Sequence, residues 1–383
     1  MIYLDAAATT PVRREVLEAM WPYLTGNFGN PSSHHSVGET AARALTDARA
    51  TLAAWWGCRP GDVVFTSGGT EANNLAIKGI ALGNPRGRHL ITTAIEHEAV
   101  LESVDYLRRL HGFEVTILET DNTGLVDAAH FAAALRDDTT LASVMLANNE
   151  IGTVQPIAEL AALAHTKGVP FHTDAVQAAG WLDLGVTTLG VDALTISGHK
   201  LGAPKGVGAL YVRGRLPLEP LVHGGGQERG RRSGTENVAG AVALATAVTL
   251  SEQGRKQRVQ QAASARDAFI AEVLSTVRGA QLTGHPTRRL PAAASFVFPG
   301  TSGESVLLEL ERRGIVSSSG SACAAGSDEA SHALLALGLD PEVAQTAVRF
   351  TWTADVSSDQ LQQAAAALHD AVAEVTSLGS ASS

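Results

Sequence analysis

The chain has 383 residues, of which 45% are hydrophobic and 18% are charged, and its formal net charge is −10. A chain of this length and composition can bury a large core, and we expect it to divide into two domains. The negative charge argues against non-specific nucleic-acid binding, so no direct nucleic-acid partner is expected.

Residues 1–5 do not combine a basic region with an apolar stretch, as a secretory signal would. Nowhere else in the sequence is an apolar segment long enough to span a bilayer. We therefore expect a cytoplasmic protein that has no membrane partner.

Further along the chain, short β-branched runs alternate with helical stretches rich in Ala and Leu. The pattern predicts buried strands at 63–66, 90–92, 115–118, 143–146 and 193–196. Between them it predicts helices at 72–80, 100–110, 127–135 and 157–165. Strict alternation of strand and helix indicates an α/β fold with a mostly parallel sheet that is covered on both faces. This block ends near Tyr211.

An Ala-rich helical region follows from 237 to 277 and is interrupted near Gly254. Beyond it, the sequence predicts strands at 294–298, 314–317 and 347–351 and helices at 304–313 and 331–337. This pattern favours a second, smaller α+β domain. The last residues, 377–383, are rich in Ser and Gly, which predicts a frayed end.

A glycine-rich segment, 66–74, lies between a predicted strand and a predicted helix. Its glycines let the backbone approach an anion closely. The N–H groups of Gly69 and Thr70 would stand at the helix N-terminus, where the helix dipole favours phosphate. The alternative is an ordinary turn capped by Thr70, and such turns are common.

Two other polar segments occupy comparable positions. His97 stands at a strand-to-helix junction, where it would cap the helix or lie at the surface, or else stack on a ligand ring and exchange protons with a substrate. Asn149, within 147–152, would offer an amide to a ligand oxygen, and the alternative is a turn. Open α/β sheets bind ligands outside the carboxyl ends of their strands, so these segments are expected to share one edge.

Asp174 and Lys200 narrow the choice of ligand. Asp174 ends an apolar run, and a buried carboxylate is costly unless a cation pairs with it. Lys200 closes the segment Ser197-Gly198-His199-Lys200, directly after a predicted strand. Pyridoxal phosphate would bring a pyridinium nitrogen to Asp174 and an aldehyde to Lys200. The alternatives are a buried helix cap and a solvated surface lysine.

Cys323 is one of only two cysteines, so neither a disulfide framework nor a cysteine-based metal site is expected, and we predict no metal. The small residues of 317–327 around it predict an exposed loop, which suits a thiol that attacks a substrate and carries the product away. A structural cysteine would have bulky apolar neighbours. Cys58 fits a small residue at a helix end, and we assign it no role.

Taken together, these segments resemble the cysteine desulfurases of the NifS and IscS type, in class V of the pyridoxal-phosphate enzymes. The resemblance runs from Tyr3 to about Asp359 and is carried by the segments 3–11, 29–33, 67–74, 96–97, 148–150, 172–177, 197–200, 223–235, 318–323 and 349–350. It implies the pyridoxal-phosphate transferase fold. A large, mostly parallel α/β cofactor-binding domain would span 16–258, and a small α+β domain with the cysteine loop would comprise 1–15 and 259–383.

The resemblance also implies roles for individual residues. Lys200 would bind the cofactor's aldehyde covalently, Asp174 would pair with its ring nitrogen, and His97 would stack on the ring as a catalytic residue. Gln177 and Asn149 would lie near the phenolic oxygen. The phosphate would be held by Gly69, Thr70, Ser197, His199 and, in a homodimer with shared sites, Thr235 of the partner subunit.

The implied activity is conversion of L-cysteine to L-alanine. Arg349 would grip the substrate carboxylate, and Cys323 would attack the substrate sulfur and hold it as a persulfide. The sulfur would then pass to an acceptor protein such as an iron–sulfur scaffold, with tRNA thiolation or other sulfur transfer as alternatives. A selenocysteine lyase or an aminotransferase would share Lys200 and Asp174 without requiring Cys323. An inactive scaffold would need neither Lys200 nor Cys323.

Overall fold

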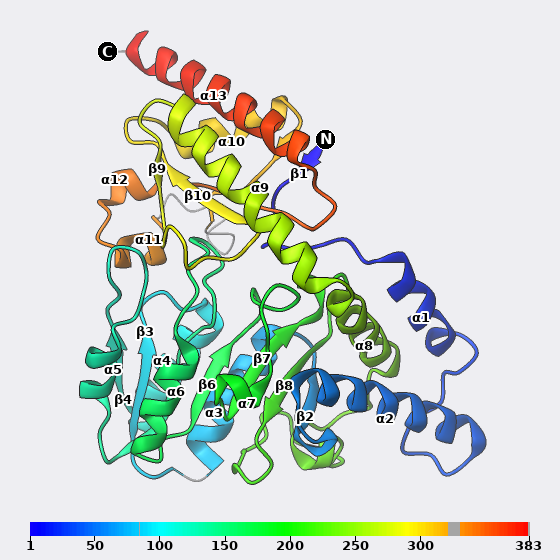
Figure 1. Ribbon diagram of the computed structural model, residues 1–383. Helices are drawn as coiled ribbons and strands as arrows, with labels where there is room; N and C mark the ends of the chain where they lie inside the picture. The colour runs from blue at the N-terminus through cyan, green and yellow to red at the C-terminus, as the bar shows by residue number, and fades with distance from the viewer. Residues whose placement is uncertain (84, 321–329, 382–383) are drawn as a thin grey trace.

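The structure is a computed structural model that describes residues 1–83, 85–320 and 330–381. It has two parts, one below the other in Figure 1. The lower part, which we name the sheet unit, contains α1 to α8 and β2 to β8. The upper part, the small unit, contains β1, β9 to β12 and α9 to α13.

The sheet unit is built on seven strands in the order β2-β8-β7-β6-β5-β3-β4. Their bounds are β2 (Val63–Thr66), β3 (His89–Thr93), β4 (Glu114–Leu118), β5 (Thr139–Ser143), β6 (Phe171–Asp174), β7 (Ala193–Ser197) and β8 (Gly208–Val212). The pairs from β4 to β7 are parallel, whereas β8 runs antiparallel to both of its neighbours. The predicted α/β fold with a mostly parallel sheet is confirmed.

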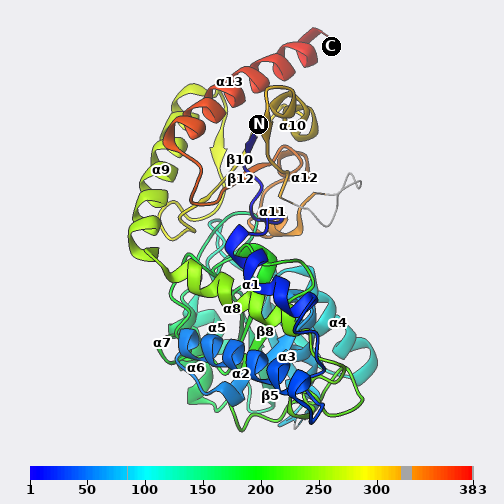
Figure 2. The same ribbon diagram turned by 90° about the vertical axis from the view of Figure 1, so that its right-hand side faces the viewer.

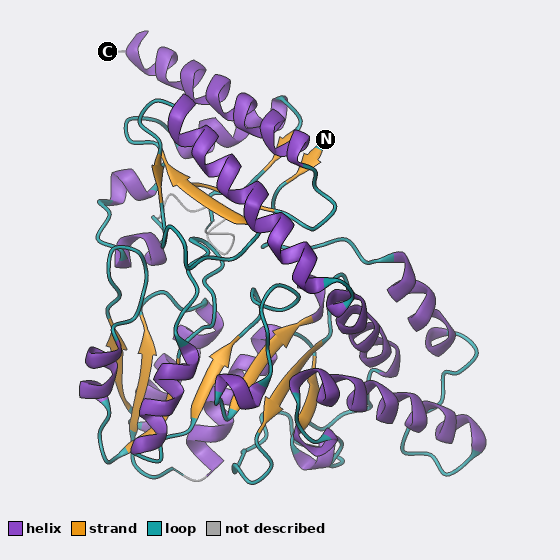
Figure 3. Ribbon diagram, in the orientation of Figure 1, coloured by secondary structure: helices purple, strands orange, loops and turns teal. Residues whose placement is uncertain are grey.

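Helices cover both faces of this sheet (Figure 3). Consecutive strand residues point to opposite faces, so Leu90 and Leu210 enter one apolar core while Ile91 and Tyr211 enter the other. This arrangement explains why the strands have apolar residues on both faces. The helices are α1 (Arg14–Leu24), α2 (Ser36–Trp56), α3 (Gly69–Gly83), α4 (Glu98–His111), α5 (Ala128–Ala134), α6 (Ile157–Thr166), α7 (Val186–Leu189) and α8 (Val238–Glu252).

One predicted strand is misplaced. The strand expected at 143–146 is β5 at Thr139–Ser143. Residues 144–146 are buried beyond its end, where the N–H groups of Val144 and Leu146 donate to the carbonyls of His172 and Asp174. The apolar run therefore marks a segment that continues alongside β6, while the threonines before it form the regular strand.

The small unit contains two short sheets. β10 (Ala293–Val297) pairs antiparallel with both β9 (Gln281–Leu282) and β12 (Val348–Thr351). β1 (Ile2–Tyr3) pairs in parallel with β11 (Ile315–Val316). The helices are α9 (Arg255–Thr276), α10 (Gly303–Arg312), α11 (His332–Ala336), α12 (Pro341–Ala344) and α13 (Ser358–Ala381).

An aromatic cluster fills the small unit. The ring of Phe269 meets Phe296, Phe350 and Trp352 edge-on, at a centroid distance of 5.3 Å for Phe350. Such edge-to-face contacts contribute beyond the area that they bury. Leu4 belongs to the same core, so the start of the chain packs with its last third. Figure 2 shows the N-terminal segment passing from the small unit to α1.

A second connection between the units, besides the N-terminal segment, is the helix pair α8 and α9. Gly254 separates them with a positive φ of 66°, so the predicted interruption near Gly254 is confirmed. For residues 377–381 the expected frayed end is wrong, because α13 continues to Ala381. Residues 382 and 383 lie outside the described residues. The domain limits 16–258 and 259–383 stay a prediction. Within the described part of the chain, no helix is both long and apolar enough to cross a membrane.

Candidate active site

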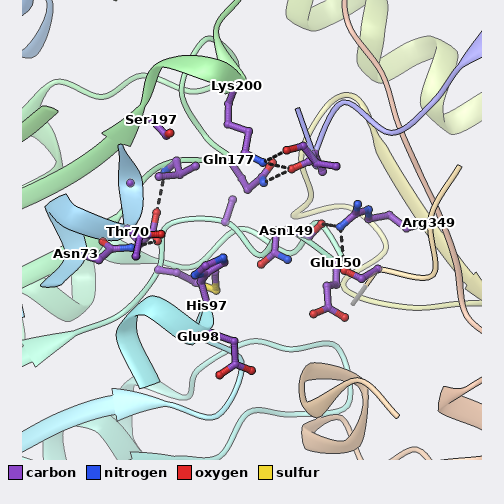
Figure 4. Close-up of a pocket in the computed structure, with 18 of the residues that line it drawn as sticks. Thr70, Asn73, His97, Glu98, Asn149, Glu150, Gln177, Ser197, Lys200 and Arg349 are labelled. Atoms are coloured by element: carbon purple, nitrogen blue, oxygen red, sulfur yellow. Dashed lines mark hydrogen bonds between the residues drawn. The ribbon is translucent and has the colours of Figure 1, made fainter. Parts of the chain in front are cut away.

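A cavity of about 560 Å³ lies at the carboxyl ends of the parallel strands, between the two units. Figure 4 shows ten of the residues around it by name. Among the residues predicted for the site, those that line this cavity are Gly69, Thr70, His97, Asn149, Asp174, Gln177, Ser197, His199, Lys200 and Arg349. Residues predicted from separate segments thus meet at one place.

The glycine-rich loop is shaped by close packing at Gly69, the first residue of α3. A Cβ atom there would lie 2.9 Å from Val176 Cγ2 and 3.3 Å from Ser197 Cβ. Glycine therefore lets the start of α3 approach the ends of β6 and β7. The helix dipole makes this N-terminus a favourable place for an anion.

Lys200 lies in a short 3₁₀ turn, Gly198–Lys200, that follows β7. Its amine donates to the carbonyl oxygens of Ala7 and of Ala8, the latter at 2.7 Å. Next to it, His199 Nδ1 is 3.1 Å from Thr9 Oγ1. Burial, together with the charges of Lys200 and Lys205, lowers the pKa of His199 to about 4. His199 is therefore a neutral ring near pH 7, able to bind an anion through a hydrogen bond.

Asp174 ends β6 and is 5% exposed. Its Oδ1 accepts from the Val176 N–H at 2.9 Å and its Oδ2 from Asn73 Nδ2 at 2.6 Å. Both donors are neutral, and no cationic side chain in the described residues forms a salt bridge with this carboxylate. Beside it, Gln177 Nε2 donates to the Ala7 carbonyl at 3.1 Å.

For His97 the sequence left open a helix cap, a surface position or a contact with a ligand. The structure shows a helix cap that also lines the cavity. Its Nδ1 accepts from the Ala99 N–H at 3.0 Å, so it is the N-cap of α4. The residue also lines the cavity. Because Nδ1 is the acceptor, the proton of the neutral ring is on Nε2.

The sequence suggested either a turn or a ligand contact for the segment 147–152. Two adjacent asparagines occupy these two positions. Asn148 makes the turn, because its Oδ1 accepts from the N–H groups of Glu150 and Ile151 at 2.8 and 2.9 Å. Asn149 lines the cavity. A small apolar cluster that includes Ile151 and Leu334 joins this turn to the small unit.

Arg349 comes from β12 and has only 2% of its side chain exposed. Nη1 donates to the carbonyls of Asn149 and Gly320 at 3.0 and 3.1 Å, and Nη2 pairs with Asp5 Oδ1 at 2.6 Å. Its Nε–H has no partner among the described residues. Arg349 therefore ties three segments together, lines the cavity and has one N–H that no described residue accepts.

One predicted residue, Thr235, is not brought into this cavity, and a second, Cys323, cannot be placed. Thr235 is exposed and is not among its lining residues. Cys323 lies outside the described residues. The described residues on either side of that gap, Gly320 and Ala330, both line the cavity.

Comparison with known proteins gives the family. The model of the family described as Aminotransferase class-V matches residues 2–363. The chain belongs to this family. Class V aminotransferases and cysteine desulfurases depend on pyridoxal phosphate, so the cofactor of this class V enzyme is pyridoxal phosphate.

Curated relatives and solved structures agree with this family. The chain is 47% identical over 351 residues to a cysteine desulfurase IscS of Dictyoglomus turgidum, covering 91% of this chain and 89% of that protein. The identity is also 47% to a cysteine desulfurase IscS of Methanosarcina thermophila, over 91% and 86%. A solved NifS-like protein is similar with a TM-score of 0.90 at 33% identity, over 97% of this chain and 99% of that one. The predicted resemblance to the NifS and IscS type is confirmed.

The donor set of the class V site fits pyridoxal phosphate. Asp174 is a buried carboxylate without a salt bridge to the described residues, and a protonated ring nitrogen would supply a cation. The close approach at Gly69 leaves a helix N-terminus open to a phosphate. Lys200 would provide the amine for the aldehyde, from the turn that follows the neighbouring strand.

The sequence analysis missed several residues of the site. Asn73 lies one helical turn after Gly69 in the same segment, so its i, i+4 spacing was an available signal. Glu150 accepts a hydrogen bond from Ser331, and His332 Nε2 lies 2.9 Å from the Glu96 carbonyl. These contacts join distant segments, and no local pattern indicates them.

Glu96 is a fully buried acid next to His97. Its Oε1 accepts from Thr93 Oγ1 and from the Met145 N–H, both at 2.8 Å. Its Oε2 has no partner among the described residues. Burial, opposed by these hydrogen bonds and assisted by the charge of Asp174, raises the pKa of Glu96 to about 8. Glu96 is therefore a neutral acid near pH 7.

Proposed function

We propose that this class V enzyme is a cysteine desulfurase that converts L-cysteine to L-alanine and places the sulfur on Cys323. The observation that carries the proposal is the cavity itself. Its lining includes Asp174 and Lys200 and also Gly320 and Ala330, which flank the segment with Cys323. Curated relatives that are 43 to 47% identical have the name cysteine desulfurase.

On the cofactor side, we assign the residues as the sequence suggests. When bound, pyridoxal phosphate withdraws electrons from the carbon skeleton of the amino acid. Lys200 would hold the aldehyde carbon, and Asp174 would keep a negative charge next to the ring nitrogen. His97 would pack against the ring with its proton on Nε2. The remaining contacts are made by Asn149 and Gln177 to the phenolic oxygen and by Gly69, Thr70, Ser197 and His199 to the phosphate.

On the substrate side, Arg349 binds the carboxylate of L-cysteine. Its guanidinium is fixed by Asn149, Gly320 and Asp5, so little side-chain entropy remains to be lost on binding. The unpartnered Nε–H and one N–H of Nη2 are the available donors. We assign the two-point grip on the substrate to this edge of the guanidinium.

The sulfur transfer balances with one enzyme thiol. The Cys323 thiolate attacks the sulfur of the substrate, an S–S bond forms and the C–S bond breaks. The electron pair of the C–S bond remains with the carbon skeleton, which takes up a proton and leaves as L-alanine. L-cysteine and the thiol thus give L-alanine and a Cys323 persulfide, and no external oxidant or reductant is needed.

The test compares the two cysteines. We expect Cys323→Ser to bind pyridoxal phosphate with an unchanged absorption spectrum and to lose alanine production from L-cysteine. Cys58→Ser is the matched control. Cys58 is half-buried, and burial raises the pKa of its thiol to about 12, so it is a poor nucleophile and its loss should leave turnover unchanged. Continued alanine production by Cys323→Ser would refute the assigned nucleophile.

We also propose a homodimer in which Thr235 of the partner subunit completes the phosphate site. The exposed position of Thr235, outside its own cavity, supports this assignment. So do the large apolar side chains exposed on and just after α1, namely Leu17, Trp21, Leu24 and Phe28. Apolar surface of this kind is typical of interfaces.

Subunit mixing tests the shared site. Lys200→Ala and Thr235→Ala homodimers are each expected to be impaired. If Thr235 acts across the interface, each mixed dimer has one intact site, and random exchange restores activity to about a quarter of the wild type. If Thr235 acted within its own chain, every mixed site would have a defect and mixing would restore nothing.

The sulfur acceptor is proposed to be a protein such as an iron–sulfur scaffold. A Cys323 persulfide labelled with ³⁵S and offered to purified candidate acceptors would identify it, because only a true acceptor removes the label rapidly. The cytoplasmic location stays a prediction.

A further inference from the structure

Asn73 is a buried amide in direct contact with Asp174. It lies on α3 with 1% of its surface exposed, and it lines the cavity. Its Nδ2 donates to Asp174 Oδ2 at 2.6 Å, which is at the short end of the range for charge-assisted hydrogen bonds. In Figure 4, Asn73 is drawn beside Thr70. Helix α3 thus begins in the glycine-rich segment 66–74 and also supplies a hydrogen-bond donor to Asp174.

The two donors to Asp174 fix the plane of its carboxylate. Val176 N–H binds Oδ1 from the chain that follows β6, and Asn73 binds Oδ2 from α3. A carboxyl group held through both oxygens cannot rotate about its terminal torsion without breaking a hydrogen bond. The remaining lone pairs of both oxygens therefore keep fixed directions.

The orientation of the Asn73 amide has a cost. Its Oδ1 is buried and has no partner among the described residues. Turning the amide over would place Oδ1 against the Asp174 carboxylate, where two acceptors would repel. The observed orientation leaves a buried carbonyl unsatisfied so that the carboxylate receives an N–H donor. A side chain with only a packing role would be apolar here.

The neutrality of Asn73 matters as much as its position. A lysine or arginine in its place would cancel the charge of Asp174 and compete with any cationic ligand. An amide orients the carboxylate and leaves its full negative charge available. The same carboxylate has no salt bridge with a described side chain, so its charge is available inside the cavity.

We infer that Asn73 is a positioning residue that orients Asp174 toward the ring nitrogen of pyridoxal phosphate. The inference rests on the role proposed above for Asp174. It predicts that Asn73 stabilises the bound cofactor only through that nitrogen. The contribution should therefore vanish when the nitrogen is absent from the ligand.

A cofactor analogue provides the test. In 1-deazapyridoxal phosphate a CH group replaces the ring nitrogen, while the aldehyde, the phenol and the phosphate remain. Apoenzyme would be titrated with each compound and the dissociation constants compared. We expect Asn73→Ala to weaken binding of pyridoxal phosphate about tenfold, the size expected for a hydrogen bond to a charged group, and to change binding of the analogue less than twofold. Equal weakening of both compounds would refute the inference.

Two further variants distinguish positioning from a purely structural role. Asn73→Asp keeps the shape of the side chain but replaces the donor with an acceptor, so it should weaken pyridoxal phosphate binding at least as much as Asn73→Ala. Asn74→Ala is the control on the same helix, because the Asn74 amide donates to the Thr70 carbonyl and does not contact Asp174. We expect Asn74→Ala to bind both compounds within twofold of the wild type.

The Asp174→Asn variant separates this inference from the proposed role of Asp174. If Asp174→Asn binds pyridoxal phosphate as tightly as the wild type does, the role of Asp174 is wrong. If Asp174→Asn is weakened but Asn73→Ala is not, the role of Asp174 stands and the inference about Asn73 is wrong. Adding Asn73→Ala to Asp174→Asn should produce no further loss, since the carboxylate that Asn73 orients is already absent.

Discussion

The two walls of the active site are built in different ways. The wall proposed to hold the cofactor, which we name the cofactor wall, consists of side chains that follow β2, β3, β6 and β7, whose carboxyl ends lie at one edge of the sheet. The wall proposed to hold the substrate, the substrate wall, joins segments that are remote in sequence, as in the ion pair of Asp5 with Arg349, which are 344 positions apart. Local strand-to-helix patterns therefore describe the first wall, whereas the second depends on how the small unit packs against the sheet unit.

The largest expected effect is on the cofactor wall, at Lys200. Lys200→Ala removes the amine that binds the aldehyde, and alanine production should fall by at least about 1,000-fold. Bound cofactor should also lose the absorption band of its link to lysine, as a spectrum would show. A variant that kept this band would place the link on another residue.

On the substrate wall, Arg349→Lys retains the charge beside Asp5 but loses the planar fork of the guanidinium. We expect the KM for L-cysteine to rise by roughly 100-fold, while the dissociation constant of pyridoxal phosphate changes less than twofold. Steady-state kinetics and cofactor titration measure the two quantities. A parallel loss of cofactor binding would mean that the walls are not independent.

A smaller effect is expected at Gly69. Gly69→Ala places a methyl group 2.9 Å from Val176 Cγ2 and 3.3 Å from Ser197 Cβ, so the start of α3 has to shift. Pyridoxal phosphate should bind about tenfold more weakly, with little change in KM for L-cysteine at saturating cofactor. Gly61→Ala is the control, because its added Cβ would meet no atom within 4 Å. Equal affinities of the two variants would contradict the steric argument.

A different kind of effect concerns stability. The pKa of Glu96 is raised to about 8 in the folded protein, from an ordinary value of 4.5. Between these values the unfolded chain has released the proton and the folded chain has kept it, so wild-type stability falls as pH rises. Glu96→Gln lacks this loss, and its stability relative to the wild type should rise by up to about 1.4 kcal/mol per pH unit from pH 5 to 8.

Urea unfolding of both proteins at pH 5 and pH 8 measures this difference. If the difference between Glu96→Gln and the wild type is the same at both pH values, Glu96 does not retain its proton in the folded protein. The measurement uses apoenzyme throughout, because bound cofactor would itself stabilise the folded state.

The sequence indicated which residues belong to the cofactor wall, but it did not predict the strand register or the long-range contacts around them. Asp174 and Lys200 were singled out because a carboxylate that ends a buried strand needs a cation, and a lysine that follows a strand stands at the ligand-binding edge. Both line the cavity, and their roles stay predictions. The register of β5 was missed because an apolar run shows burial and does not show where regular pairing ends. The function of Arg349 in holding Asn149 and Gly320 was missed because it depends on long-range packing.

For some residues, the sequence pattern and the structure were both needed to describe their position. His97 was predicted either to cap a helix or to face a ligand, and the structure shows a cap that also lines the cavity. Asn73 belonged to a segment that the sequence singled out, but its contact with Asp174 depends on the placement of α3 beside β6. The roles of Thr235 and Cys323 stay predictions.

The N-terminal segment has a consequence for the order in which the site can form. Residues 5–10 lie between the two units, where Ala7 and Ala8 accept from Lys200, Thr10 donates to the His199 carbonyl, and Asp5 pairs with Arg349. During synthesis Asp5 leaves the ribosome 344 positions before its partner, Arg349. The sheet unit has all of its strands by residue 212. The cavity can therefore assemble only after all strands of the sheet unit have been made.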